Sequence, residues 1–377
     1  MQINKTRYIL SLIGSFLLGA VLIGGFCAVK MNSPEYASLD NNKIKEIQEQ
    51  IDAVYLNDYN IEDLIEGACK GYVSGLGDQY TVYMGAKEYQ SWLATTTGDY
   101  SGVGITFALD GDARCVIQQV NEGSPAEKAG IKPGDYIIKV NDKTYDEYQD
   151  VDVLASDIRG KEGTKVTLTI SRDGEEKDVT MTRSHITLNS VSYEMMGNIG
   201  YIEIDSFMEN TASDFKKALN AVQKQGAKSL ILDLRDNGGG LVDQCVDIAD
   251  EFLDEGVICY TEDKDGNRDS YDAEDGKTDL KTVVLINENS ASASEILAAA
   301  MKDNGFELVG ETSFGKGVIQ GTIEFDDGSA LKITVMQYLS PKENVIHHKG
   351  IEPTYKVEND SDSETDAQLE KAKELLR

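Results

Sequence analysis

The stretch that decides the fold is Asn289-Ser290-Ala291-Ser292-Ala293-Ser294-Glu295, which lies between an apolar run at 283–286 and a helix-like stretch at 296–302. The apolar run is typical of a buried parallel strand, so the serines occupy a strand-to-helix turn. A serine in such a turn can be exposed and lie in the field of the helix N-terminus. The alternative is a helix cap, because Ser292-x-x-Glu295 is a capping box. Capping needs only one serine, whereas small neighbours would let a substrate backbone approach a nucleophile.

Strands and helices alternate outward from this turn. Strand-like runs at 199–204 and 230–234 flank a helical pattern at 215–222, which ends at Gly226. The second run is almost continuously apolar, as in a parallel strand that is buried on both faces. This order predicts an α/β core over residues 186–357.

A second segment, Thr312-Ser313-Phe314-Gly315-Lys316-Gly317-Val318-Ile319-Gln320, places one lysine in a glycine turn before strand-like sequence. A lysine can act as a base when burial removes its proton, so the two segments outline a Ser-Lys hydrolase. A phosphate-binding loop is a weaker alternative. Gly317 stands where that motif needs Ser or Thr, and no helix follows. The plainest alternative is an exposed lysine in a turn.

A glycine-rich turn follows the buried strand in Leu232-Asp233-Leu234-Arg235-Asp236-Asn237-Gly238-Gly239-Gly240. Glycine amides in such a turn can point at a developing oxyanion. The alternative is a tight loop in which Asp233 and Arg235 form a structural ion pair, and both interpretations can hold at once.

Residues 100–185 read as a small, mostly β module. Strand-like runs are separated by turn signals at Asp110-Gly111, Pro133-Gly134 and Asp173-Gly174, and a helix-like stretch lies at 151–158. At its start, Gly102-Val103-Gly104-Ile105 is a small-residue loop before a strand. The free amides of such a loop can hold a terminal carboxylate while the strand edge pairs with the peptide.

The N-terminus carries a targeting signal. Residues 8–29 contain no charge and are long enough to span a bilayer, and Lys5 and Arg7 precede them. We expect an uncleaved anchor, because a signal peptide usually has a shorter apolar core. Residues 42–94 then read as helical, with a break at the glycines near 75–78. They predict a cap or a dimerising arm.

Composition excludes several classes of function. The net charge of −30 argues against nucleic-acid partners and anionic lipid surfaces. The chain has three histidines and neither HExxH nor CxxC, which makes a catalytic zinc site unlikely, and we expect no metal and no cofactor. With no histidine near the serine cluster, a Ser-His-Asp triad is disfavoured. The odd number of cysteines predicts buried free thiols: Cys27, Cys69, Cys115, Cys245 and Cys259.

Over nearly its whole length the chain resembles the carboxyl-terminal processing peptidases, or tail-specific serine proteases. Residues 76–84 are similar to the N-terminal signature of that family, with Gln79 where proline is usual. Residues 102–185 are similar to its inserted PDZ domain, in which the strand order is permuted. The segments similar to its catalytic motifs follow in order: 232–240, 289–295 and 314–320.

The resemblance implies a role for each matching residue. Ser292 corresponds to the nucleophile, Lys316 to the general base and Gln320 to the residue that orients the lysine. The amides of Ala293 and Gly239 correspond to the oxyanion hole, with a register that the three successive glycines leave open by one. Arg159 resembles a PDZ arginine implicated in a ligand-dependent switch, and residues 102–105 would bind the peptide C-terminus.

The organisation that this resemblance implies has five parts. They are a cytoplasmic start and transmembrane anchor (1–30), a helical arm (31–97), a PDZ domain (98–185), a ClpP/crotonase-like α/β serine protease domain (186–357), and an acidic tail with a C-terminal helix (358–377). The resemblance also implies a homodimer built through the terminal helices.

The predicted function is that of a single-pass cell-membrane endopeptidase with its bulk on the extracytoplasmic side. It would capture protein or peptide substrates by their free C-termini and cleave them through an acyl-enzyme. The alternative is a PDZ adaptor or chaperone with an inactive protease domain, against which the intact Ser292, Lys316 and Gln320 argue. A nucleotide-binding enzyme is a distant third.

Overall fold

A computed structural model describes residues 42–148, 151–274, 277–360, 363 and 365–377. The predicted anchor at 8–29 lies outside these ranges. Among the helices that are described, none combines the length and the apolar character needed to cross a bilayer. The chain divides into two compact units, Met1–Leu64 and Ile65–Arg377, and each is considered by itself.

The described part of the first unit is mainly helix α2 (Asn42–Val54). Its apolar residues Ile44, Ile47 and Val54 are all more than half exposed. Helix α3 (Ile61–Ser74) begins in this unit and ends at the predicted glycine break. The sequence pattern missed a short strand, β1 (Val82–Met84), which separates α3 from α4 (Ala86–Thr97).

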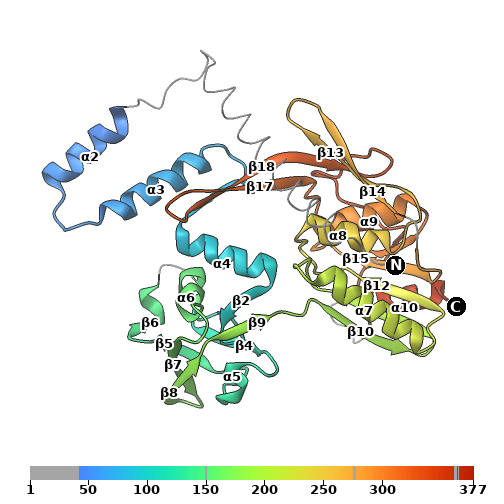
Figure 1. Cartoon of the computed structure of the whole chain (residues 1–377), viewed down its shortest axis with the longest axis horizontal. Helices are drawn as coiled ribbons and strands as arrows, with labels where there is room; N and C mark the ends of the chain where they lie inside the picture. Colours follow the sequence, from blue (N-terminus) through green and yellow to red (C-terminus); the bar gives the residue numbers. More distant parts are fainter. Residues whose placement is uncertain (1–41, 149–150, 275–276, 361–362, 364) are drawn as a thin grey trace, which may run out of the picture. The chain divides into compact units, whose positions relative to one another are not determined.

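The β-rich module predicted at 100–185 is present in the second unit (Figure 1). Its main sheet has the order β3-β4-β5-β7-β8, with β6 on β5, and β2 pairs with β9 to bring the two ends of the module together. Ile117, Ile137 and Leu168 fill its core. Its elements are β2 (Asp99–Gly102), β3 (Ile105–Leu109), β4 (Cys115–Val120), α5 (Pro125–Lys128), β5 (Tyr136–Val140), β6 (Lys143–Thr144), η1 (Tyr145–Glu147), α6 (Val151–Ile158), β7 (Lys165–Arg172), β8 (Glu175–Thr182) and β9 (Ser184–Thr187).

The predicted α/β core is built on a six-stranded sheet of order β10-β11-β12-β15-β16-β19. Strand β10 is antiparallel to β11, and the remaining neighbours are parallel. Parallel strands align their carboxyl ends at one edge, so the loops after β12 and β15 meet there. The elements of this core are β10 (Val191–Met196), β11 (Ile199–Ile204), α7 (Thr211–Lys224), β12 (Ser229–Asp233), α8 (Val242–Asp250), β15 (Lys281–Ile286), α9 (Ala293–Asp303), β16 (Glu307–Gly310) and β19 (Tyr355–Lys356).

The two faces of this sheet are covered by different helices. Side chains of α7, α8 and α9 pack on one face around Ile202, Leu232 and Val284. Helix α10 (Ala367–Leu375) packs on the other face, where Ala372 is fully buried. At least that side of the C-terminal helix, for which the resemblance implies a dimer contact, is therefore covered by the chain's own sheet.

A second sheet joins the N-terminal signature to the lysine segment. Its longest strand, β18 (Ala330–Leu339), pairs with β1 near its start and with β13 (Gly256–Asp263) near its end. Strand β17 (Val318–Glu324) also runs along β18, and β14 (Arg268–Ala273) completes the sheet on β13 (Figure 1).

The cysteines within the described ranges are free thiols. Cys115, Cys245 and Cys259 are buried, as predicted, while Cys69 is half-buried. Burial raises the pKa of Cys115 to about 11 and that of Cys259 to about 12, so both thiols stay protonated and unreactive near neutral pH.

Candidate active site

Ser292 occupies a strained turn between β15 and α9. It is the N-cap residue of the helix, with φ 57° and ψ −116°. A positive φ at a residue other than glycine costs about 1–3 kcal/mol and persists only where the surroundings enforce it. A serine on a tight strand-to-helix turn is presented outward, as a nucleophile requires.

The other two serines of the cluster are committed to structural hydrogen bonds. Ser290 Oγ donates to Leu234 O at 2.8 Å, and Ser294 Oγ donates to Asn237 O at 2.9 Å. Both residues are fully buried, whereas Ser292 is half-buried. The alternation that we noted in the sequence therefore separates two structural serines from one that a substrate can reach.

The glycine turn packs directly against Ser292. A Cβ on Gly239 would lie 2.6 Å from Ala291 O and 2.8 Å from Ser292 Cβ, and the residue has φ +99°, so only glycine fits. Its amide donates to Asn237 Oδ1 at 2.8 Å and is thus engaged within the turn. The Ala293 amide, by contrast, is the first of helix α9, where an N–H has no intrahelical acceptor.

Asn237 is a residue whose importance the sequence did not reveal. It is fully buried, and its Nδ2 donates to Ile204 O at 2.7 Å. Its carbonyl accepts the Ala291 amide as well as the Ser294 hydroxyl. One side chain and its peptide therefore join the glycine turn to the serine turn.

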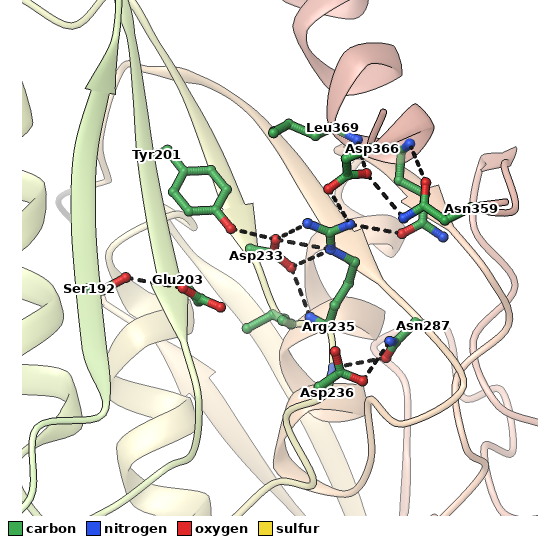
Figure 2. Close-up of polar contacts among 12 residues, drawn as sticks. Ser192, Tyr201, Glu203, Asp233, Arg235, Asp236, Asn287, Asn359, Asp366 and Leu369 are labelled. Carbon is green, nitrogen blue, oxygen red and sulfur yellow. Dashed lines mark hydrogen bonds and ion pairs between the residues drawn. The ribbon is translucent and has the colours of Figure 1, made fainter. Parts of the chain in front are cut away.

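Charged residues just before the glycine turn fix it to the tail and to the serine loop (Figure 2). The Arg235 guanidinium donates to Asp233 Oδ2 at 2.6 Å and to Asp366 Oδ2 at 2.8 Å, which confirms the predicted ion pair and extends it to the C-terminal segment. Asp236 accepts from Asn287 Nδ2 at 2.9 Å, and this hydrogen bond, together with one from Asn289, lowers the pKa of Asp236.

Lys316 is half-buried in the turn that precedes β17. Burial lowers its pKa below the ordinary value, and the nearby Lys332 ammonium lowers it further. The carboxylates of Glu295 and Asp78 act in the opposite direction. Lys316 Nζ lies 5.0 Å from the centre of the Tyr80 ring, and no hydrogen bond joins it to Ser292 Oγ in the described part of the chain.

The Gln320 side chain bonds to a neighbouring strand. Its Nε2 donates to Thr334 Oγ1 at 3.3 Å, and no hydrogen bond from it to Lys316 is present among the described residues. Thr334 N in turn donates to Thr81 Oγ1, and that hydroxyl donates to Asp78. These contacts connect the 76–84 signature to the lysine strand, and the orienting role of Gln320 stays a prediction.

Glu295 does more than cap α9. This buried carboxylate accepts hydrogen bonds from the Ser292 amide at 2.9 Å and from the Lys316 amide at 2.8 Å. The sequence pattern indicated the first contact, because Glu295 lies three residues after the N-cap. The second contact joins two segments that are distant in the sequence.

The loop predicted to bind a carboxylate is intact in the β module. Gly104 has φ +77°, and a Cβ there would lie 2.4 Å from Ser124 Cβ. The carbonyls of Val103 and Gly104 accept hydrogen bonds, whereas their amides donate to no other group of the described chain. Gly102 and Ile105 flank these free donors and are buried.

Arg159 connects the β module to helix α4. Its Nη1 donates to Ser91 O at 3.0 Å and to Ser91 Oγ at 2.7 Å. The guanidinium also lies 4.9 Å from the centre of the Tyr100 ring, in the strand that leads into residues 102–105. The residue therefore contacts both the strand before that loop and the helix that follows β1.

Comparisons with known proteins agree with this architecture. Residues 198–357 match peptidase family S41, residues 101–182 match the PDZ domain, and residues 28–88 match the N-terminal domain of the activating protease CtpB. A CtpA-like serine protease of Staphylococcus saprophyticus is 37% identical over 371 residues, which cover 95% of this chain and 74% of that protein. A CtpA-like serine protease of Staphylococcus aureus strain MRSA252 is also 37% identical, over 369 residues that cover 95% and 74% of the two chains.

A solved structure gives a similar result. The photosystem II D1 C-terminal processing protease aligns with a TM-score of 0.51 and 28% identity, over 83% of this chain and 86% of that one.

Proposed function

The chain belongs to peptidase family S41 and is a serine peptidase with a PDZ domain, and from this premise we propose that it is a membrane-anchored endopeptidase with a Ser-Lys mechanism. The observation that carries the proposal is the strained Ser292, which packs against Gly239 while a half-buried lysine lies on the adjoining turn. A PDZ domain of permuted strand order and a ClpP/crotonase-like protease core are part of the proposal.

In this mechanism neutral Lys316 Nζ takes the proton from Ser292 Oγ as the oxygen attacks the scissile carbonyl carbon. The tetrahedral oxyanion is held by the Ala293 amide and an amide of the glycine turn. The lysine ammonium then protonates the leaving amine, and the C–N bond breaks to give the acyl-enzyme. A water molecule, deprotonated by the same amine, attacks the ester and regenerates Ser292.

The base must be neutral for the first step. An ordinary lysine has a pKa near ~10.4, so action near neutral pH needs a decrease of roughly three units, or about 4 kcal/mol of differential environment. Burial and the Lys332 ammonium both act in that direction. Desolvation by a bound substrate would add to them.

Catalysis also needs two side chains and one backbone amide to change partners. Lys316 Nζ has to move from the Tyr80 ring to Ser292 Oγ, and Gln320 has to turn from Thr334 toward the amine. The amide of Gly239 has to leave Asn237 Oδ1, or its neighbour in the turn has to serve as the donor.

A peptide bound to the PDZ domain would be the ligand that drives this change of partners. We propose that a substrate C-terminal carboxylate binds the free amides of Val103 and Gly104 while the peptide pairs with β3. Arg159 contacts Tyr100, two residues before that loop, and Ser91 on α4, so binding of a peptide to the loop can alter the contacts of α4. The next residue of α4, Trp92, lies 5.6 Å from Lys332 Nζ, the ammonium that lowers the pKa of Lys316.

We also propose a single-pass anchor at residues 8–29, with the bulk of the chain outside the cytoplasm. The charge pattern of the sequence supports this orientation. A homodimer through the N-terminal helices is consistent with the exposed apolar residues of α2, such as Ile44 and Ile47.

The test is a serine-reactive fluorophosphonate probe and an unfolded protein substrate, applied to the full chain and to Ser292→Ala. We expect the wild-type chain to be labelled and to cleave, and the variant to do neither while it remains folded. Proteins whose C-termini differ between cells carrying the two forms would then identify substrates. A fully active Ser292→Ala variant would exclude the mechanism.

A PDZ adaptor with an inactive protease domain is the second candidate. Two observations favour it. The lysine amine lies over the Tyr80 ring, and the Gly239 amide already donates to Asn237 within its own turn. It predicts a chain that binds peptides with free C-termini but neither reacts with the probe nor cleaves protein, with or without such a peptide.

A further inference from the structure

We propose that Glu295 and Tyr338 are positioning residues that together fix the backbones of Ser292 and Lys316 at one separation, an inference that rests on the Ser-Lys function proposed above. Neither side chain is expected to touch substrate. Each acts through the peptide groups of the two reacting residues.

Glu295 holds the amide sides of both segments. One carboxylate oxygen, Oε2, accepts from the Ser292 and Lys316 amides at 2.9 and 2.8 Å. The other, Oε1, accepts from Ser313 Oγ at 2.6 Å and from the Gly315 amide at 2.7 Å. Three of the four donors belong to the lysine segment and one belongs to the serine turn.

The partners of this carboxyl group fit its ionised form. All four donate to it, and three of them are backbone amides, which cannot accept a hydrogen bond. A fully buried carboxylate is costly unless each oxygen is satisfied, and here both accept two hydrogen bonds. The Glu295 carboxylate therefore links the lysine turn to the serine turn, and loss of these hydrogen bonds would leave a buried charge unsatisfied.

Tyr338 holds the carbonyl sides of the same two residues. Its hydroxyl lies 3.0 Å from Ser292 O and also contacts Lys316 O, so its single proton is shared between two acceptors. The side chain is 1% exposed, and burial raises the pKa of the phenol well above its usual range, which keeps the donor protonated. Tyr338 N also donates to Gly317 O at 3.1 Å, which fixes β18 against the lysine turn.

Together the two side chains hold the N–H and the C=O of both Ser292 and Lys316. Peptide groups fixed on both sides leave rotation of the side chains as the main freedom of Oγ and Nζ. Misplacement of a reacting group by about 1 Å can cost about 10²-fold in rate. Glu295 and Tyr338 together set the separation of the two backbone segments. We therefore expect their loss to affect the rate of acylation more than the binding of substrate.

The two residues differ in charge, which gives a readout that a purely structural role would not change. Glu295 is an anion that raises the pKa of Lys316 against the effects of burial and Lys332, while Tyr338 is neutral. Among the described residues, the charged and titratable groups around the lysine turn include Glu295, Lys332, Asp78, Tyr80, Tyr338, His347 and His348. Removing the Glu295 charge should lower the pH at which the base becomes neutral, and removing the Tyr338 hydroxyl should not.

The first experiment compares Tyr338→Phe with the wild-type full chain in detergent. With casein as substrate we expect kcat to fall about 10- to 100-fold with KM changed by less than about threefold, and fluorophosphonate labelling to slow in parallel. The matched control is Tyr89→Phe, which removes a partly buried hydroxyl that bonds to Glu324, at the end of β17 that is farther from the lysine turn. The control should keep wild-type kcat.

The second experiment measures the pH dependence of kcat/KM for Glu295→Gln. We expect a kcat at least as low as that of Tyr338→Phe and an acid limb displaced to lower pH, whereas Tyr338→Phe keeps the wild-type limb. Thermal unfolding of each variant shows whether it is folded at the assay temperature. If Glu295→Gln does not fold, the comparison of Tyr338→Phe with Tyr89→Phe still tests the positioning role.

The possible failures are distinguishable. A wild-type chain that neither cleaves nor labels contradicts the proposed function itself. An active wild-type chain with unchanged kcat in Tyr338→Phe overturns the positioning role, as does a loss of kcat no greater than the fraction of unfolded protein. An unmoved acid limb in folded Glu295→Gln overturns the electrostatic part.

Discussion

The serine turn and the lysine turn differ in how completely they are assembled. Ser292 is held at a strained φ, its neighbours Ser290 and Ser294 are buried and bonded, and Gly239 packs on its Cβ. The backbone around Lys316 is equally well held, but its amine lies over the Tyr80 ring. The backbone frame is thus complete, while the side chains of the proposed nucleophile and the proposed base are not bonded to each other.

This difference indicates that regulation can act on the Lys316 side chain with only a small change in free energy. Moving a side chain between two partners requires a small free-energy change, whereas rebuilding a strained turn would require a large one. A ligand shifts such an equilibrium only by its preference for one of the two states.

Among the changes that leave the proposed nucleophile and base in place, the largest effect is expected from Gly239→Ala, which disrupts the serine turn. Its Cβ would meet Ala291 O at 2.6 Å and Ser292 Cβ at 2.8 Å, in a backbone with φ +99°. We expect kcat to fall by about 10²-fold or more, because the serine or the oxyanion donors must shift. Gly238→Ala adds the same methyl group to open space and should retain most activity. Equal activity in the two variants would refute the close packing.

A change on the lysine side should move the pH profile with a smaller effect on the fold. Lys332→Met keeps the bulk of the side chain beside Trp92 but removes a charge that lowers the pKa of Lys316. The pKa of the base should rise, so the acid limb of kcat/KM should move to higher pH and activity should recover in alkaline buffer. The exposed Lys342→Met serves as the control. An acid limb that stays in place or moves to lower pH would contradict this account of the lysine.

The smallest effect is expected from Arg159→Ala, which cuts the link between the carboxylate loop and α4. A peptide with a free apolar C-terminus should speed cleavage of an unrelated unfolded protein in the wild-type chain, and its C-terminally amidated form should not. The variant should lose most of this stimulation while binding the peptide nearly as well, because the proposed donors to the carboxylate are the amides of Val103 and Gly104 and not the guanidinium. A normal response would leave the PDZ domain as a tether only.

Much of the frame could be predicted from the sequence, because it depends on local patterns. The apolar runs before Asp233 and Asn287 read as parallel strands, and the small residues of 289–295 marked the turn. Helix α6 lies where the helix-like stretch predicted it, and the turn residues of 100–185 correctly indicated a mostly β module.

The rest depends on contacts between distant segments, for which a single sequence carries no local signal. Nothing at position 338 distinguishes a tyrosine that bonds to two catalytic segments from any half-buried strand residue. Glu295 was recognised as a cap, but its bonds to the 313–316 turn depend on how α9 meets that turn. Strand β1 was missed because its three residues form a strand only by pairing with β18.

The central claim is that Ser292 is the nucleophile and Lys316 its base. The most direct test is to label the full chain with a fluorophosphonate probe in the presence of a peptide with a free apolar C-terminus, and to map the adduct by mass spectrometry. The account predicts a single adduct on Ser292 and almost none in Lys316→Arg, which keeps the charge but cannot act as a base near neutral pH. An adduct on another residue, or undiminished labelling of Ser292 in Lys316→Arg, would contradict it.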